Sequence, residues 1–136
     1  PMGSALCGSK EFIAKAHRLR KMAGGGLRQA GFMAAAASYA LDHQVLRLAE
    51  DHQLMQHLAQ GLSGIPGLQV EAPQTNILFV DLVGEAKAKG AALQTHLKQA
   101  GIDMTGLYRM RFVTHLDVDR AGIDRTISAV RQFFNA

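Results

Sequence analysis

The sequence lacks the features that mark secreted and membrane proteins. Its 136 residues include a single cysteine, Cys7, so no disulfide can form within the chain and a reducing, cytoplasmic compartment is favoured. No apolar run approaches the roughly 18 residues of a membrane-spanning helix. The first residues also lack the basic stretch and apolar stretch of a signal peptide. We therefore expect a cytoplasmic protein without a membrane span.

Recognisable catalytic and metal-binding spacings are also scarce. The six histidines make no metal-ligand spacing with one another, with the cysteine or with carboxylates. The segment around Ser4 and Ser9 lacks the turn of a nucleophilic serine, so hydrolysis by such a residue has no support. A catalytic role is conceivable for His115 and Asp117. A connection into a helix capped by Asp119 explains both residues more simply.

The formal net charge of +4 arises from one short segment. Residues 10–28 contain six basic residues against one acidic residue, and the rest of the chain is slightly negative. This distribution indicates a local anion site and not a generally basic protein. A nucleic-acid site would add a set of stacking aromatic residues or a recognisable module, and neither accompanies the cluster. We therefore expect no nucleic-acid partner.

Hydrophobic periodicity predicts a helical first part. A short buried strand is expected at residues 4–8, followed by a helix that Ser9 caps and three glycines end. A second helix is expected from about residue 27 to about residue 41. The third is the clearest, because its apolar residues step by three and four throughout. Its apolar stripe comprises Val45, Leu48, His52, Met55, Ala59 and Leu62. Asp51, on the same helix, is interpreted as structural.

From residue 68 onwards the pattern changes to alternating strands and helices. Strands are expected at 68–71, 76–82, 102–105 and 109–114, and helices at 86–100 and after Asp119. The second strand is nearly continuous in apolar residues, which is typical of a strand covered on both faces. The order β-β-α-β-β-α predicts a small α/β domain with helices on one face of a sheet.

The segment GGGLRQ, residues 24–29, is a candidate anion site. Glycines let backbone N–H groups approach a ligand, and the helix expected from residue 27 adds a positive dipole end. Arg28 in its first turn and Lys21 on the preceding helix supply charge suited to a phosphate. Alternatively, the glycines merely separate two helices and the basic residues are solvated. The pattern alone favours this alternative, because it matches neither a P-loop nor a dinucleotide-binding motif.

Two arginines share one face of the last predicted strand. Alternation places Arg109 and Arg111 on one face and Met110 with Phe112 on the other. An arginine held on a strand beside a core can bind a substrate carboxylate through two parallel hydrogen bonds. Two solvated arginines on an exposed face are the alternative, and the strand pattern alone slightly favours it.

Four segments resemble, in order, motifs of the low-specificity L-threonine aldolases. They are PMGS at 1–4, KMAGGGLRQAG at 21–31, QTNILFV at 74–80 and RFVTHLDV at 111–118. Together they extend along the whole chain and are more specific than any single motif. The family has fold type I of the pyridoxal-phosphate enzymes. The resemblance implies the C-terminal part of such an enzyme, with the end of the large domain at 1–44, a connecting helix at 45–67 and a small α/β domain at 68–136.

The resemblance also implies an activity. These enzymes cleave L-threonine or L-allo-threonine to glycine and acetaldehyde by a retro-aldol step, with pyridoxal 5'-phosphate as cofactor. It implies that Arg111 binds the substrate α-carboxylate, and that Lys21 and Arg28 reach the cofactor phosphate of a neighbouring subunit in a homotetramer with shared active sites. It places the cofactor-binding lysine upstream of Pro1, so this chain alone is expected to be inactive.

One loop departs from the family pattern, and other functions stay open. Residues 103–108 replace the serine-, proline- or glycine-rich turn that is frequent in the family, which leaves the substrate preference undefined. A related fold type I lyase or aminotransferase would share the architecture without aldol cleavage. A non-catalytic fragment that serves as an interaction domain is the alternative outside enzymes.

Overall fold

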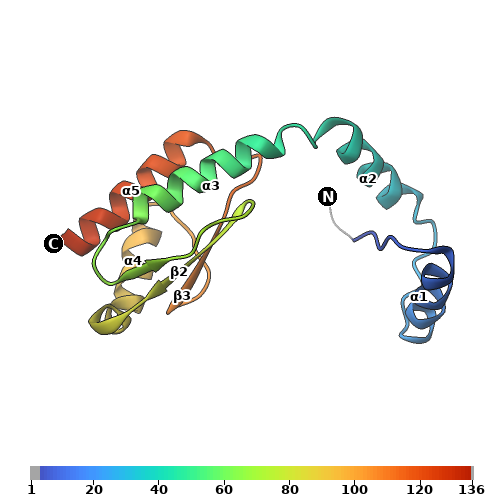
Figure 1. The fold of residues 1–136 in the computed structure, drawn as a ribbon, viewed down its shortest axis with the longest axis horizontal. Helices are drawn as coiled ribbons and strands as arrows, with labels where there is room; N and C mark the ends of the chain where they lie inside the picture. Colours follow the sequence, from blue (N-terminus) through green and yellow to red (C-terminus); the bar gives the residue numbers. More distant parts are fainter. Residues whose placement is uncertain (1–3, 136) are drawn as a thin grey trace. The chain divides into compact units, whose positions relative to one another are not determined.

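The computed structural model describes residues 4–135, which form two compact units that divide between Leu46 and Arg47. Figure 1 colours the first unit in blue and teal and the second from green to red. In this described stretch no helix is long and apolar enough to cross a membrane.

The first unit consists of two helices, α1 (Lys10–Met22) and α2 (Gly31–His43). Ser9 caps α1 as predicted, because its hydroxyl accepts a hydrogen bond from the Phe12 N–H at 3.2 Å. Neither helix buries a residue within this unit.

Two expectations for the first unit are wrong. Residues 4–8 are irregular and exposed, since none of the described strands pairs with them and an unpaired strand is not stable. Helix α2 begins at Gly31 and not near residue 27. Gln29 has a positive φ of 51°, a left-handed conformation that interrupts helical geometry just before α2.

The second unit is a three-stranded antiparallel sheet covered on one face by helices, which confirms the α/β prediction. Figure 1 shows α3 and α5 side by side over the sheet. In order the elements are α3 (Leu48–Leu62), β1 (Leu68–Val70), β2 (Ile77–Leu82), the 3-10 helix η1 (Gly84–Lys89), α4 (Gly90–Gln99), β3 (Arg109–Val113) and α5 (Arg120–Asn135). Fully buried side chains from α3, α4 and the strands meet in one core that includes Met55, Leu62, Leu78, Val80, Leu93, Leu97 and Met110.

Several local predictions for the second unit need correction. The strand expected at 102–105 is wrong, because only Thr105 forms a bridge and Gly106 turns the chain with a φ of 85°. The helix expected from residue 86 is a 3-10 helix as far as Lys89. On α3, Leu54 and Leu58 are buried although the predicted stripe omitted them.

Strand β2 alternates in burial and is not covered on both faces. Leu78, Val80 and Leu82 face the core, whereas Ile77, Phe79 and Asp81 on the other face are half-buried. Within the described residues of the second unit, no helix packs on that face. The open face of the sheet is the one that carries the predicted arginines.

An exposed link joins the two long helices of the second unit. His57 Nε2 on α3 lies 2.6 Å from Asp124 Oδ1 on α5, and Arg120 Nε lies 3.5 Å from the same oxygen. The hydrogen bond with His57, assisted by the charge of Arg120, holds the pKa of Asp124 below its ordinary value of 3.8.

Removing this carboxylate should weaken the fold in a pH-dependent manner. Because the folded-state pKa is lowered, the link stabilises the fold above about pH 4, and the stabilisation disappears as the pH falls through the folded-state pKa. We expect Asp124→Asn to unfold at a lower urea concentration than the parent near about pH 6, with the difference vanishing in acid. Circular dichroism measures the urea unfolding of variant and parent at each pH. Glu85→Gln, which removes an exposed carboxylate elsewhere, serves as the control. A difference that persists at low pH would contradict the assignment.

Candidate functional site

The open face of the sheet arranges its side chains in rows across the strands. Phe79 pairs with Arg111, and the Glu71 N–H donates to the Phe79 carbonyl at 3.0 Å, so these residues form one row. The next row holds Gln69, Asp81 and Arg109. The hydrogen bonds between β2 and β3 fall on even-numbered residues, so Phe79 and Arg111 form a non-hydrogen-bonded pair, in which side chains come closest.

Arg109 is held by three neighbours on this face. Its Nη2 lies 2.6 Å from Glu71 Oε1, and its Nη1 donates to Asp81 Oδ2 at 3.0 Å. The guanidinium carbon lies 4.5 Å from the centre of the Phe79 ring, which is a cation–π geometry. Arg109 therefore engages both carboxylates and is not a freely solvated arginine.

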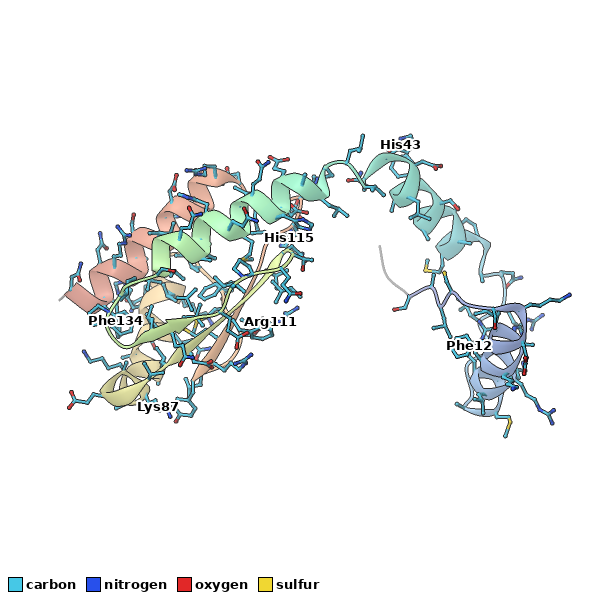
Figure 2. The ribbon with its side chains drawn as sticks, in the orientation of Figure 1. Phe12, His43, Lys87, Arg111, His115 and Phe134 are labelled. Carbon is cyan, nitrogen blue, oxygen red and sulfur yellow. The ribbon has the colours of Figure 1, made fainter. Side chains whose placement is uncertain are left out.

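Arg111 is anchored through its backbone, and its side chain is exposed. Its N–H donates to the Thr105 carbonyl at 2.8 Å, which ties the loop before β3 to the strand. No hydrogen bond or ion pair engages its guanidinium within residues 47–135. Figure 2 labels Arg111 on the sheet of the second unit. The predicted shared face of Arg109 and Arg111 is confirmed, and only Arg111 has an unoccupied fork.

The loop at 103–108, which departs from the family pattern, folds back on β3. Within the loop, the Met104 side chain is buried. Gly106 has a φ of 85°, and a Cβ at this position would collide with the Arg109 carbonyl. A residue with a side chain is therefore strained there, and the glycine fixes how the chain enters the arginine strand.

A polar network lies at the C-terminal end of β3 and was not predicted from the sequence. The Thr114 N–H donates to the Asn76 carbonyl at 3.0 Å, and Asn76 Nδ2 donates to the Thr114 carbonyl at 2.8 Å. The buried Thr114 hydroxyl donates to the Asp51 carbonyl on α3 at 2.8 Å. The Asp51 carboxylate receives two bonds from Arg47, at 2.7 and 3.0 Å. Asn76 and Thr114 both lie in motifs that resemble the aldolases, which was the available clue.

The residues after β3 form the connection into α5, and the cap predicted for Asp119 is confirmed. The Asp117 N–H donates to His115 Nδ1 at 3.3 Å, and both side chains are exposed. Asp119 caps α5 by accepting from the Gly122 N–H at 2.7 Å.

In the first unit, the glycines at 24–26 cap α1. The N–H groups of Gly24 and Gly25 donate to the carbonyls of Lys21 and Arg20 at 3.2 and 2.8 Å, and that of Gly26 donates to Gly24 at 3.1 Å. All three N–H groups thus have partners within the turn, which favours the alternative that the glycines separate two helices over amides that point at an anion. Gly24, with a φ of 85°, makes this turn possible.

The same turn positions the Lys21 side chain. The Lys21 ammonium lies 3.1 Å from where a Cβ of Gly26 would stand, so the missing side chain leaves room for the lysine over the loop. Arg28 follows in the irregular segment before α2 and not in a first helical turn. No side chain caps the N-terminus of α2. Neither Lys21 nor Arg28 forms an ion pair within residues 4–46.

A protein-family model described as "Beta-eliminating lyase" matches residues 1–85, more than half of the chain. The chain belongs to the beta-eliminating lyase family. This family match includes the Lys21 and Arg28 segment and strand β2, and it ends before the Arg111 strand.

Curated relatives that align with nearly the whole chain are the low-specificity L-threonine aldolases that the sequence motifs resemble. The chain is 42% identical over 133 residues to the low specificity L-threonine aldolase of Escherichia coli (strain K12), covering 98% of this chain and 39% of that protein. It is 36% identical over 140 residues to the probable low-specificity L-threonine aldolase 2 of Arabidopsis thaliana, covering 100% of this chain and 39% of that one. The chain thus spans about two fifths of the length of the curated relatives it matches.

A solved structure shares the fold of this beta-eliminating lyase chain. It is described as "Transaminase with L-ala", and it superposes with a TM-score of 0.66 over 93% of this chain and 34% of that chain, at 17% identity. At this identity the likeness concerns the fold alone. The resemblance to low-specificity L-threonine aldolases and the fold type I architecture are both confirmed.

Proposed function

We propose that the chain is the C-terminal part of a pyridoxal-phosphate-dependent threonine aldolase that cleaves L-threonine or L-allo-threonine to glycine and acetaldehyde. The observation that carries the proposal is the unpaired guanidinium of Arg111, fixed on a strand in a chain similar to threonine aldolases along nearly its whole length. The complete enzyme would be a cytoplasmic homotetramer with shared active sites.

Arg111 would bind the α-carboxylate of the amino acid. A guanidinium fork matches a carboxylate through two parallel charge-assisted hydrogen bonds. Two bonds fix the orientation of the substrate as well as its position, so the Cα–Cβ bond can be held in the geometry that cleavage requires. Pyridoxal phosphate, when bound, supplies the electron sink for that cleavage.

Lys21 and Arg28 would hold the cofactor phosphate. The residues of the first unit fit such a group, because Lys21 lies over the side-chain-free Gly26 and Arg28 precedes a helix N-terminus that no side chain caps. Neither cation is neutralised by a carboxylate of its unit. We place the lysine that binds the cofactor covalently before residue 1, and the domain limits at 1–44, 45–67 and 68–136, as the resemblance implies.

Cofactor retention tests the phosphate assignment. We expect the Lys21→Ala/Arg28→Ala variant of the complete enzyme to bind pyridoxal phosphate roughly 100-fold more weakly, because two charge-assisted contacts worth about 1.5 kcal/mol each are lost. The measurement is cofactor absorbance after dialysis. Lys10→Ala/Arg18→Ala, which removes two exposed cations of α1 with the same net charge change, is the matched control. Equal retention by both variants would refute the role.

A product assay tests the activity itself. The complete enzyme, supplied with L-threonine, should release glycine and acetaldehyde in equal amounts without a keto-acid acceptor. Formation of a keto acid that depends on such an acceptor would instead indicate an aminotransferase and would overturn the aldolase proposal.

A further inference from the structure

We propose that Arg109 keeps Arg111 available for the substrate by neutralising the two carboxylates that share its sheet face. This inference rests on the proposed function, in which Arg111 binds the α-carboxylate. Arg109 would thus be a positioning residue, which acts on the substrate only through Arg111.

The rows of the sheet place both carboxylates within reach of Arg111. Asp81 pairs with Arg109, one row away from Arg111, and is therefore its diagonal neighbour on the adjacent strand. Diagonal neighbours lie within reach of long side chains. Glu71 lies in the same row as Arg111, on the other side of Phe79. Without another cation, either acid competes with a substrate for the Arg111 guanidinium.

Arg109 occupies both acids at once. Its side chain crosses the Phe79 ring at 4.5 Å and reaches Glu71 at 2.6 Å, while its second terminal nitrogen holds Asp81 at 3.0 Å. The stacking on Phe79 orients the fork between the two carboxylates. Two acids and two arginines share this part of the face, and Arg109 takes both acids, which leaves the Arg111 fork unpaired within residues 47–135.

The solvent exposure of this cluster separates an electrostatic role from a structural one. The side chains of Arg109, Glu71 and Asp81 are 52%, 43% and 29% exposed. Exposed ion pairs of this kind contribute about 1 kcal/mol or less to folding. Loss of the cluster should therefore leave the fold intact while changing the charge next to Arg111.

The first test is Arg109→Met in the complete enzyme, which removes the charge and keeps an apolar side chain over Phe79. We expect the KM for L-threonine to rise roughly 10-fold. The substrate carboxylate then meets two uncompensated negative charges, and Arg111 is already paired with Asp81 or Glu71. The kcat should stay within about twofold, since the contact to the carboxylate re-forms once the substrate is bound. The crystal structure of this variant should show Arg111 paired with Asp81 or Glu71.

The second test is a rescue that a structural role would not allow. The triple variant Glu71→Gln/Asp81→Asn/Arg109→Met removes both competing carboxylates together with the guanidinium of Arg109 that neutralises them. We expect its KM to return to within about twofold of the parent value, because no carboxylate of the face remains to engage Arg111. A triple variant as impaired as Arg109→Met would overturn the proposal and assign a structural role to Arg109.

The outcome is distinguishable from failure of the proposed function. If Arg111→Ala leaves the KM unchanged, the carboxylate assignment fails and the role of Arg109 fails with it. If Arg111→Ala raises the KM but Arg109→Met does not, only the shielding role is refuted. Thermal unfolding of each variant, expected within a few degrees of the parent, excludes loss of the fold as the cause.

Discussion

Replacing Arg111 by alanine in the complete enzyme is expected to raise the KM for L-threonine roughly 100-fold or more, because the proposed bidentate charge-assisted contact, worth about 3 kcal/mol or more, is lost. The Arg111 fork is exposed and has no partner within residues 47–135, so its removal leaves no buried charge unpaired. Cofactor absorbance should be retained, since the proposed phosphate contacts come from the first unit. Steady-state kinetics and the absorbance spectrum measure the two effects separately.

Two further variants sharpen this expectation. Arg111→Lys keeps the positive charge but offers no planar fork, so it should recover only part of the affinity. Arg125→Ala removes an exposed arginine from α5, on the helical side of the second unit, and should leave the KM unchanged. An Arg111→Ala enzyme with parental KM would refute the assignment of the carboxylate site.

Features that depend on neighbouring residues in the sequence were predictable. Ser9 and Asp119 were expected to cap their helices, because an N-cap needs only a short polar side chain and an N–H two or three residues later. The shared face of Arg109 and Arg111 followed from the two-residue period of a strand. Such features are fixed by local geometry, which one sequence specifies without knowledge of the tertiary fold.

Features that depend on distant partners were not predictable. The strand predicted at 102–105 does not form. Its residues alternate apolar and polar, which is the pattern of a strand, but Gly106 turns the chain after a single bridge at Thr105. The open face of β2 was misjudged because side-chain polarity does not say whether a helix packs there. Likewise, the spacing of the two arginines could not show that Glu71 and Asp81 both engage Arg109.

The first unit illustrates the same limit for burial. Phe12 and Leu19 have the helical spacing of a core-facing stripe, and α1 forms as predicted, but these side chains are 49% and 63% exposed. The spacing thus predicts the helix, whereas burial depends on a packing partner that spacing does not identify. The glycines at 24–26 were similarly ambiguous, because a helix end and an anion site both need glycine.

The second large effect is expected from Arg47, whose replacement by methionine should lower the free energy of unfolding of the second unit by about 3 kcal/mol. Arg47 makes two bonds to Asp51, whose side chain is only 3% exposed. Removing the arginine leaves a buried carboxylate without its cation. Because the Asp51 carbonyl also accepts the Thr114 hydroxyl, the loosening should extend to the end of β3. Hydrogen exchange of the slowest amides of α3 and β3 measures the loss.

The double variant Arg47→Met/Asp51→Leu separates the cost of an unpaired charge from the net value of the pair. Replacing both members of a buried ion pair by apolar residues of similar size is often close to neutral, so the double variant should recover most of the loss. The Thr114 hydroxyl would still find its acceptor, because it bonds to the backbone of residue 51 and not to the carboxylate. A loss of unfolding free energy below about 1 kcal/mol for Arg47→Met alone would contradict this expectation. It would mean that water hydrates the Asp51 carboxylate once the arginine is removed, and that the pair contributes no more than a surface ion pair.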